Sequence, residues 1–193
     1  MSPRDTILTA VRNNRPKGEY ALPELPTFPL DDGGDRTGFF LANFEAMGGK
    51  PHAGGLASAL RDGFPDAKVI ASAVPETAGT VDLAAIAHPR ELSDVDVAVV
   101  RGSFAIAETG SILLVDDDLV VNAVAYLAQH LIVLVDPADI LLTTQEAYLR
   151  PEFSRHRYCV FHTGPSATAD IEGVLIHGAQ GVRSLTAVLA PRA

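Results

Sequence analysis

Seven short apolar runs follow one another after residue 67, and they constrain the fold more than any other feature. Each run is four to six residues long, the length of a strand rather than of a helix. Several are apolar at consecutive positions, which is typical of a sheet covered on both faces. The runs are 68–71, 95–100, 112–115, 131–135, 158–161, 174–177 and 185–189. The stretches between them, 79–88, 119–129 and 139–149, have room for short helices or turns, so the pattern predicts a three-layer α/β/α sandwich.

The first part of the chain differs from this pattern. Apolar residues at helical spacing predict short helices over 3–13, 39–47 and 54–62. Between the first two, residues 15–35 contain four prolines and three glycines, a composition that blocks both helix and central strand. We expect a short N-terminal helix and an extended, proline-rich arm over 1–35, followed by a single α/β domain over 36–193.

Length, charge and cysteine content exclude several classes of protein. The 193 residues leave no room for a second full-size domain, and a net charge of −9 argues against nucleic acid or an anionic membrane as a partner. The single cysteine, Cys159, excludes an intrachain disulfide, a cysteine-based zinc site and a four-thiolate iron–sulfur cluster. With no apolar run near the ~18 residues of a membrane span, we expect a cytoplasmic protein in a reducing compartment.

Polar and glycine-rich segments follow four of the predicted strands. They are 101–103, 136–137, 162–166 and 178–181. In open α/β sheets the ligand crevice lies outside the carboxyl ends of the parallel strands, so we expect these segments to meet at one edge. The alternative is that each is an ordinary turn. His130 and His177 abut predicted strands and are weaker candidates for the same site.

Residues 163–173 are the most unusual segment, with two glycines, a proline and several hydroxyl and carboxylate groups. Free backbone N–H groups, helped by Ser166 and Thr168, can cradle a carboxylate or phosphate. Asp170 and Glu172 would then fix the loop, accept a proton or hold a cation. The competing interpretation is that Ser166 caps a short helix with Asp170 in its first turn.

Glu108 precedes a glycine in the turn before the run 112–115. If that strand is antiparallel to its neighbours, Glu108 lies at the same sheet end as the other loops, where it can act as a base or nucleophile. The alternative is a solvated glutamate at a turn. The six histidines show no metal-ligand spacing, residues 116–118 look like a solvated hairpin turn, and the sequence has no GxGxxG, P-loop or GxSxG motif. We therefore predict no metal site.

The chain resembles the LUD family, and more narrowly its lactate utilisation protein C branch, over about residues 36–190. The resemblance is carried by Ala107-Glu108-Thr109-Gly110-Ser111, Thr163-Gly164-Pro165-Ser166, Thr168-Ala169-Asp170-Ile171-Glu172 and Gly178…Gly181. It implies a fold similar to the NagB/RpiA/CoA-transferase group. It also implies a part in oxidising L-lactate to pyruvate beside two sister proteins, of A and B type, that carry iron–sulfur clusters.

The sequence departs from the family pattern at three places. Ala167 stands where the family usually has arginine, Gln180-Gly181-Val182 replaces a histidine–glycine–proline turn, and residues 126–130 lack the usual proline. These changes remove an arginine and a histidine from the expected pocket.

Three functions follow as hypotheses. The first is a cluster-free component of an L-lactate utilisation system, which binds a small carboxylate or organises the iron–sulfur partners and itself binds no cofactor. The second is a stand-alone enzyme related to CoA transferases and isomerases, using Glu108 on a thioester or sugar phosphate, and the third is a structural module with a degenerate site. The expected catalytic residues are Glu108 and Asp170. The expected ligand contacts are Arg101, Ser103, Thr109, Gly110, His130, Gly164, Pro165, Ser166, Thr168, Glu172, Gly178 and Gln180.

Overall fold

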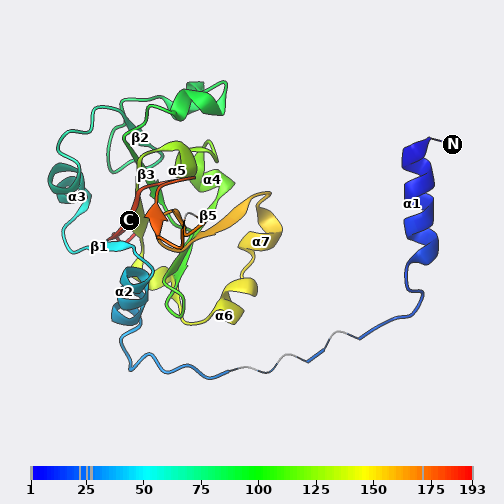
Figure 1. The fold of residues 1–193 in the computed structure, drawn as a ribbon. Coiled ribbons are helices and arrows are strands. Elements are labelled where there is room, and N and C mark those ends of the chain that lie inside the picture. Colours follow the sequence, from blue (N-terminus) through cyan, green and yellow to red (C-terminus); the bar gives the residue numbers. More distant parts are fainter. Residues whose placement is uncertain (1, 22, 25, 27, 171, 193) are drawn as a thin grey trace.

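A parallel sheet lies at the centre of the domain, with helices packed around it (Figure 1). The computed structural model describes residues 2–21, 23–24, 26, 28–170 and 172–192. The five strands stand in the order β1-β11-β6-β3-β2. Their bounds are β1 Lys50–His52, β2 Ile70–Ser72, β3 Val97–Arg101, β6 His130–Val135 and β11 Ser184–Leu189. Apart from the residues at their ends, β3, β6 and β11 are buried, so the prediction of an α/β sandwich from two-faced apolar runs is confirmed.

A second, mixed sheet packs beside the first and was not predicted from the sequence. Its order is β7-β4-β5-β8, with bounds β4 Phe104–Ile106, β5 Ser111–Val115, β7 Ile140–Leu141 and β8 Cys159–His162. β5 runs antiparallel to both β4 and β8. The runs 112–115 and 158–161 therefore form strands as expected, but they pair with each other and not with the central sheet.

The helices are short, as the lengths of the intervening stretches predict. Their bounds are α1 Pro3–Asn14, α2 Arg36–Ala46, α3 Leu56–Gly63, α4 Asp116–Leu119, α5 Val124–Leu127, α6 Thr144–Tyr148 and α7 Glu152–Arg155, with 3-10 turns η1 Leu83–Ala85, η2 Pro89–Leu92 and η3 Pro137–Asp139. Residues 116–118 begin α4 and do not form the expected hairpin turn. α2 matters most for the core, because Phe40 and Phe44 are both fully buried.

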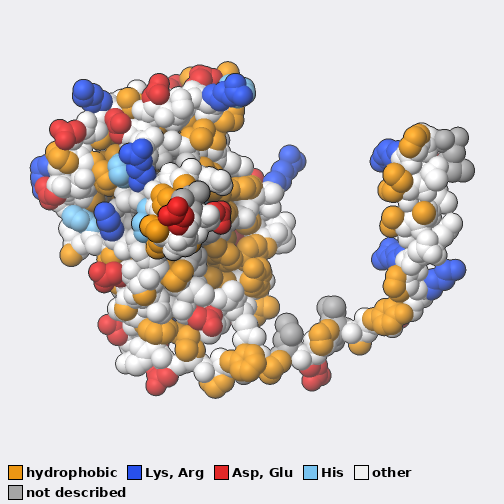
Figure 2. All heavy atoms as spheres, in the orientation of Figure 1, with side chains coloured by type: hydrophobic (Ala, Val, Ile, Leu, Met, Phe, Trp, Pro, Cys, Tyr) orange, Lys and Arg blue, Asp and Glu red, His pale blue; other side chains and the backbone are white. Residues whose placement is uncertain are grey.

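The N-terminal helix and the extended arm have the predicted local structure. Ser2 and Asp5 form a capping box that starts α1. None of the described residues of α1 is buried, and Figure 1 shows it standing away from the sheets at the end of the arm. Figure 2 shows apolar side chains exposed along this arm. A contact far along the chain also joins the arm to the domain, since Gln145 Nε2 donates to the carbonyl of Pro26 at 3.0 Å.

The run 174–177 is not a core strand. Only Ile176–His177 form a strand, β10, which pairs with β9 (Ala167–Thr168) in a separate two-stranded hairpin. Val174 and Leu175 are each 60% exposed. An apolar run does not by itself determine whether a strand is buried or with which strand it pairs. Here the flanking Gly173 and Gly178, both with positive φ, turn the chain away from the central sheet.

Within the described residues, no helix is both long and apolar enough to span a membrane.

Candidate functional site

The two motif segments, 107–111 and 163–166, lie side by side in the structure. Because β5 and β8 are antiparallel, Ser111 begins one strand close to where the other ends. Ser111 Oγ and Thr163 Oγ1 are 2.6 Å apart, and Thr109 Oγ1 donates to Ser111 Oγ at 2.8 Å. The strand after Glu108, β5, is antiparallel to both of its neighbours, as the expectation for Glu108 required. This pairing brings residues far apart in the chain to one place.

The carboxylate of Glu108 has a partner within the domain. Its Oε2 accepts hydrogen bonds from Thr144 N at 2.8 Å and Thr144 Oγ1 at 2.9 Å, at the start of α6. Its side chain is otherwise exposed. A carboxylate that accepts a backbone N–H in the first turn of a helix stabilises that helix end. This arrangement favours a structural role for Glu108 over that of a nucleophile.

The loop 163–166 is held tightly against the end of α2. Gly164 has φ +78°, and a Cβ there would lie 2.0 Å from the carbonyl oxygen of Met47. On the other side, Ser166 N donates to Val182 O at 3.0 Å and Gly178 N donates to Ser166 O at 2.8 Å. The Ser166 N–H is therefore not free for an anion. Ser166 does not cap a helix either, because the next residues form β9.

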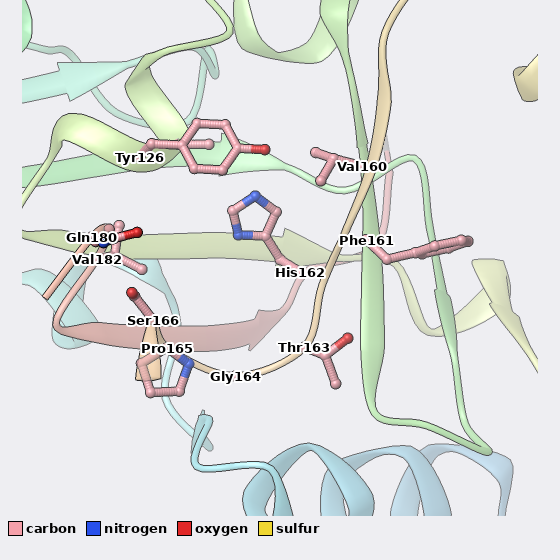
Figure 3. A pocket seen from close by; sticks show the side chains of 12 residues that line it. Tyr126, Val160, Phe161, His162, Thr163, Gly164, Pro165, Ser166, Gln180 and Val182 are labelled. Carbon is pink, nitrogen blue, oxygen red and sulfur yellow. The ribbon is translucent and has the colours of Figure 1, made fainter. Parts of the chain in front are cut away.

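A cavity of about 240 Å³ opens between this loop and α5 (Figure 3). It is lined by Ala125, Tyr126, Val160, Phe161, His162, Thr163, Gly164, Pro165, Ser166, Gln180, Gly181 and Val182. The ring of His162 lies among these side chains, 5.3 Å from the ring of Tyr126 between centroids. The Tyr126 hydroxyl bonds to that of Tyr158, and burial together with this bond raises the pKa of the Tyr126 phenol.

His162 begins the polar segment 162–166 but was not predicted as a catalytic or ligand-binding residue from the sequence. Its side chain is 9% exposed, and its Nε2 has no hydrogen-bond partner among the described residues. Burial lowers the pKa of the imidazole to about 4. The signal available in the sequence was its position, directly before the Thr-Gly-Pro-Ser segment, but a histidine at the end of a strand is more often structural.

His162 is expected to make the fold less stable as the pH falls. The folded-state pKa of about 4 lies below the ordinary 6.5, so between these values the unfolded chain binds a proton that the folded chain does not. The free energy of unfolding should fall across this window by up to about 3 kcal/mol. Urea unfolding at pH 7 and pH 4.5 of the natural chain and of His162→Phe checks this. On acidification the free energy of unfolding should fall less in the variant than in the natural chain. Equal decreases in the two proteins would contradict the lowered pKa of His162.

Arg101 and Ser103 lie at the opposite end of the central sheet from the motif segments. In the pairing of β3 with β6, Val97 stands opposite His130 at the start of β6, whereas Arg101 stands opposite Leu134 near its end. Arg101 pairs with Glu76 and donates to Ala190 O at 2.7 Å. The expectation that all the polar segments share one edge is wrong, because β8 and β10 lie outside the parallel sheet.

Ser103 belongs to the same distant end. Its hydroxyl donates to Asp118 Oδ2 at 2.5 Å, and burial raises the pKa of the Asp118 carboxyl. Close by, the ligand atoms of Asp116, Asp117 and His156 lie within 4.8 Å of one another. The sequence pattern did not indicate this group. His156 Nδ1 is 3.0 Å from Asp116 Oδ1, and Arg157 N donates to Asp116, so the group already has partners within the chain.

His130 lies at the same sheet end as the motif segments, beside a second cavity of about 340 Å³. Its Nδ1 is 2.8 Å from Ser184 Oγ, and its ring packs on Phe64 at 4.8 Å. Burial, then the positive charges of Arg183 and Lys50, lower the pKa of the imidazole. Arg183 lines this cavity as well and was missed by the sequence analysis. On the face seen in Figure 2, Lys and Arg side chains lie beside histidines although the whole chain is acidic.

The remaining predicted residues lie on the exposed hairpin. Ser166, Thr168, Asp170 and Gln180 line one open cavity of about 280 Å³ at its base. Asp170 and Glu172 are exposed, and Glu172 has φ +53°. Ile171 of the motif lies outside the described residues. A Cβ on Gly178 would lie 2.4 Å from Arg183 Cγ, so this glycine allows the hairpin to lie against the arginine.

The comparisons with known proteins agree with this architecture. The LUD domain family matches residues 55–190. A crystal structure of a DUF162 family protein from Deinococcus radiodurans is similar, with a TM-score of 0.62 and 17% sequence identity over 83% of this chain and 99% of that one. At such low identity the likeness concerns the fold. No curated protein matches the chain. Because the family match covers most of the sequence, the chain belongs to the LUD domain family.

Proposed function

We propose that this chain is a cluster-free component of an L-lactate utilisation system, of the lactate utilisation protein C type. The observation that carries the proposal is the LUD match over residues 55–190, since this family is associated with lactate utilisation and membership supports a general role there. The finer assignment rests on the motif residues, which the fold gathers around the loop 163–166. We place the system in the cytoplasm, in line with the single cysteine.

Electron transfer in such a system would belong to iron–sulfur partners of A and B type. A four-thiolate cluster needs more cysteines than this chain has. Cys159 is half-buried in β8, and its Sγ lies 3.7 Å from the Glu152 carbonyl oxygen. In this proposal the chain binds the substrate carboxylate or holds the partners together, and it carries no cofactor of its own.

The arrangement at the start of β6 and β11 supports a carboxylate site beside Arg183. The family arginine is absent at Ala167, but Val182, which accepts the Ser166 N–H, is adjacent to Arg183 in the chain. Arg183 and His130 line the same cavity, and so do Asp66 and Asp96. The Asp96 carboxylate is engaged by the backbone N–H groups of Lys68 and Val69. A guanidinium offers a carboxylate two parallel hydrogen bonds, which makes Arg183 the natural anchor for a small 2-hydroxy acid.

Replacing Arg183 by glutamine is expected to weaken L-lactate binding at least about tenfold, because a charge-assisted hydrogen bond is lost. Isothermal calorimetry on the full chain measures this. Arg4→Gln is the matched control, since it removes the same charge from α1, outside the domain. Equal losses in both variants would mean that net charge, not the site, sets the affinity.

Co-purification of the tagged chain from its native cytoplasm tests the partner half of the proposal. We expect brown partner proteins to co-purify, with iron–sulfur absorbance in their ultraviolet-visible spectrum. If partners are absent and lactate does not bind, the proposal fails. A thioester-dependent adduct lost in Glu108→Gln would instead favour the enzyme alternative, although Glu108 already binds Thr144.

A further inference from the structure

The cavity beside His162 has properties that the proposed function does not use. Its walls are largely apolar, formed by Ala125, Val160, Val182 and the ring of Tyr126. Polar groups come from Thr163, Ser166 and Gln180. At about 240 Å³ it is smaller than the ~300–1,000 Å³ of sites for drug-sized ligands. Its size suits a small molecule with an apolar body.

A buried imidazole lies within this cavity lining. His162 is nine-tenths buried, and its Nε2 has no partner among the described residues. Buried polar atoms in folded proteins nearly always have a hydrogen-bond partner, so this atom needs an explanation. Because Nε2 is itself closed to solvent, a molecule in the cavity would bond to the other ring nitrogen, Nδ1. Figure 3 shows the imidazole reaching into the space between Tyr126 and Ser166.

The cavity lacks the charges that an anionic ligand needs. None of the described residues that line it is a lysine, arginine, aspartate or glutamate. His162 is neutral at pH 7, because burial lowers its pKa to about 4. A carboxylate placed here would lose its hydration without gaining a cation. The carboxylate site proposed above, beside Arg183, is a different cavity.

The walls of the cavity are held in place before any ligand arrives. Gly164 packs against the Met47 carbonyl, where a Cβ would lie at 2.0 Å, and a Cβ on Gly181 would lie 3.0 Å from Ser166 Cβ. These close approaches fix the loop on both sides of Ser166. A preformed site binds small molecules with little ordering cost.

We propose that this cavity binds a small uncharged molecule, whose polar group hydrogen-bonds to the His162 imidazole and whose apolar part packs on Tyr126 and Val182. A primary amide, an alcohol or a ketone has the required chemistry. This site is additional to the carboxylate site and does not depend on the role in lactate utilisation.

A matched pair of probes that differ only in charge tests the proposal. The full chain is titrated with isobutyramide and separately with isobutyrate, and amide chemical shifts of Ser166, Gly181 and Val182 are followed by NMR. Isobutyramide should bind at least tenfold more tightly than isobutyrate. Equal affinities, or no isobutyramide-dependent shifts at these residues up to its solubility limit, would overturn the proposal and leave the cavity as a water site.

Two variants locate the binding. His162→Phe removes the ring nitrogens, and Gln180→Trp blocks the mouth at an exposed position where the fold is not at risk. Each should weaken isobutyramide binding at least fivefold, whereas Arg183→Gln should leave it unchanged and weaken only lactate. Unaltered binding in Gln180→Trp, with the fold intact, contradicts the proposed site even if His162→Phe does not fold. The result for isobutyramide does not depend on whether the chain binds L-lactate, so the two proposals are tested separately.

Discussion

Replacing Phe44 by alanine is expected to lower the free energy of unfolding by about 4 kcal/mol, the typical cost of removing a buried aromatic ring. Phe44 is fully buried in α2, and its ring lies 5.6 Å from that of Phe40. The neighbouring residues cannot easily fill the space left by the ring, because the backbone at Gly49 and Gly110 already lies close to Phe44. A Cβ on Gly49 would lie 2.4 Å from the Phe44 ring, and one on Gly110 would lie 2.3 Å from its backbone nitrogen.

Urea unfolding of the two proteins measures this effect. Phe28→Ala is the matched control, because Phe28 is 71% exposed in the arm and its loss should cost less than about 0.5 kcal/mol. If Phe44→Ala cost no more than this control, α2 would not belong to the core. The domain would then begin near residue 55, where the family match begins, and not at residue 36.

Replacing Gly164 by alanine is expected to cost about 4 kcal/mol, since two penalties add. Its φ of +78° is a strained conformation for an L-residue, at ~1–3 kcal/mol. The new methyl group would also lie 2.0 Å from the Met47 carbonyl oxygen, so the loop or α2 must shift, at a further ~1–3 kcal/mol. The same urea experiment measures the sum, and displacement of the loop should also weaken ligand binding.

Gly173→Ala separates the two penalties. Gly173 has a similar φ of +72°, but nothing lies within 4 Å of the position of its Cβ. This variant should show the conformational penalty alone, about 1 kcal/mol. If both variants lost the same stability, the contact with Met47 would contribute nothing, and the loop would be free to move away from α2.

Sequence periodicity predicted the buried strands of the central sheet well. The runs 95–100, 131–135 and 185–189 became β3, β6 and β11, because consecutive β-branched and aliphatic residues suit a sheet covered on both faces. Four of the very short strands were not predicted. β1, β4, β7 and β9 have two or three residues each, too few to show a period. β1 and β4 form beside the longer strands β11 and β5.

The candidate site was predicted only in part. The motif segments do come together, since Ser111 and Thr163 are hydrogen-bonded. Arg101 and Ser103 lie at the far end of the sheet, because sequence does not reveal to which sheet a strand belongs. His162 was named only as the first residue of the segment 162–166, and Arg183 was not named at all, for a related reason. A single histidine or arginine forms no periodic pattern or motif in the sequence. Its importance comes from burial, or from neighbouring residues that belong to other segments of the chain.

The sequence by itself determined the α/β class, the family and the short N-terminal helix, since these depend on local pattern and motif. Only the tertiary structure decided which strands share a sheet, that Glu108 binds Thr144, and that His162 lines a cavity with no partner for its Nε2 among the described residues. These features depend on contacts between residues far apart in the chain. Such contacts are set by the packing of the whole domain, and no local stretch of sequence encodes them.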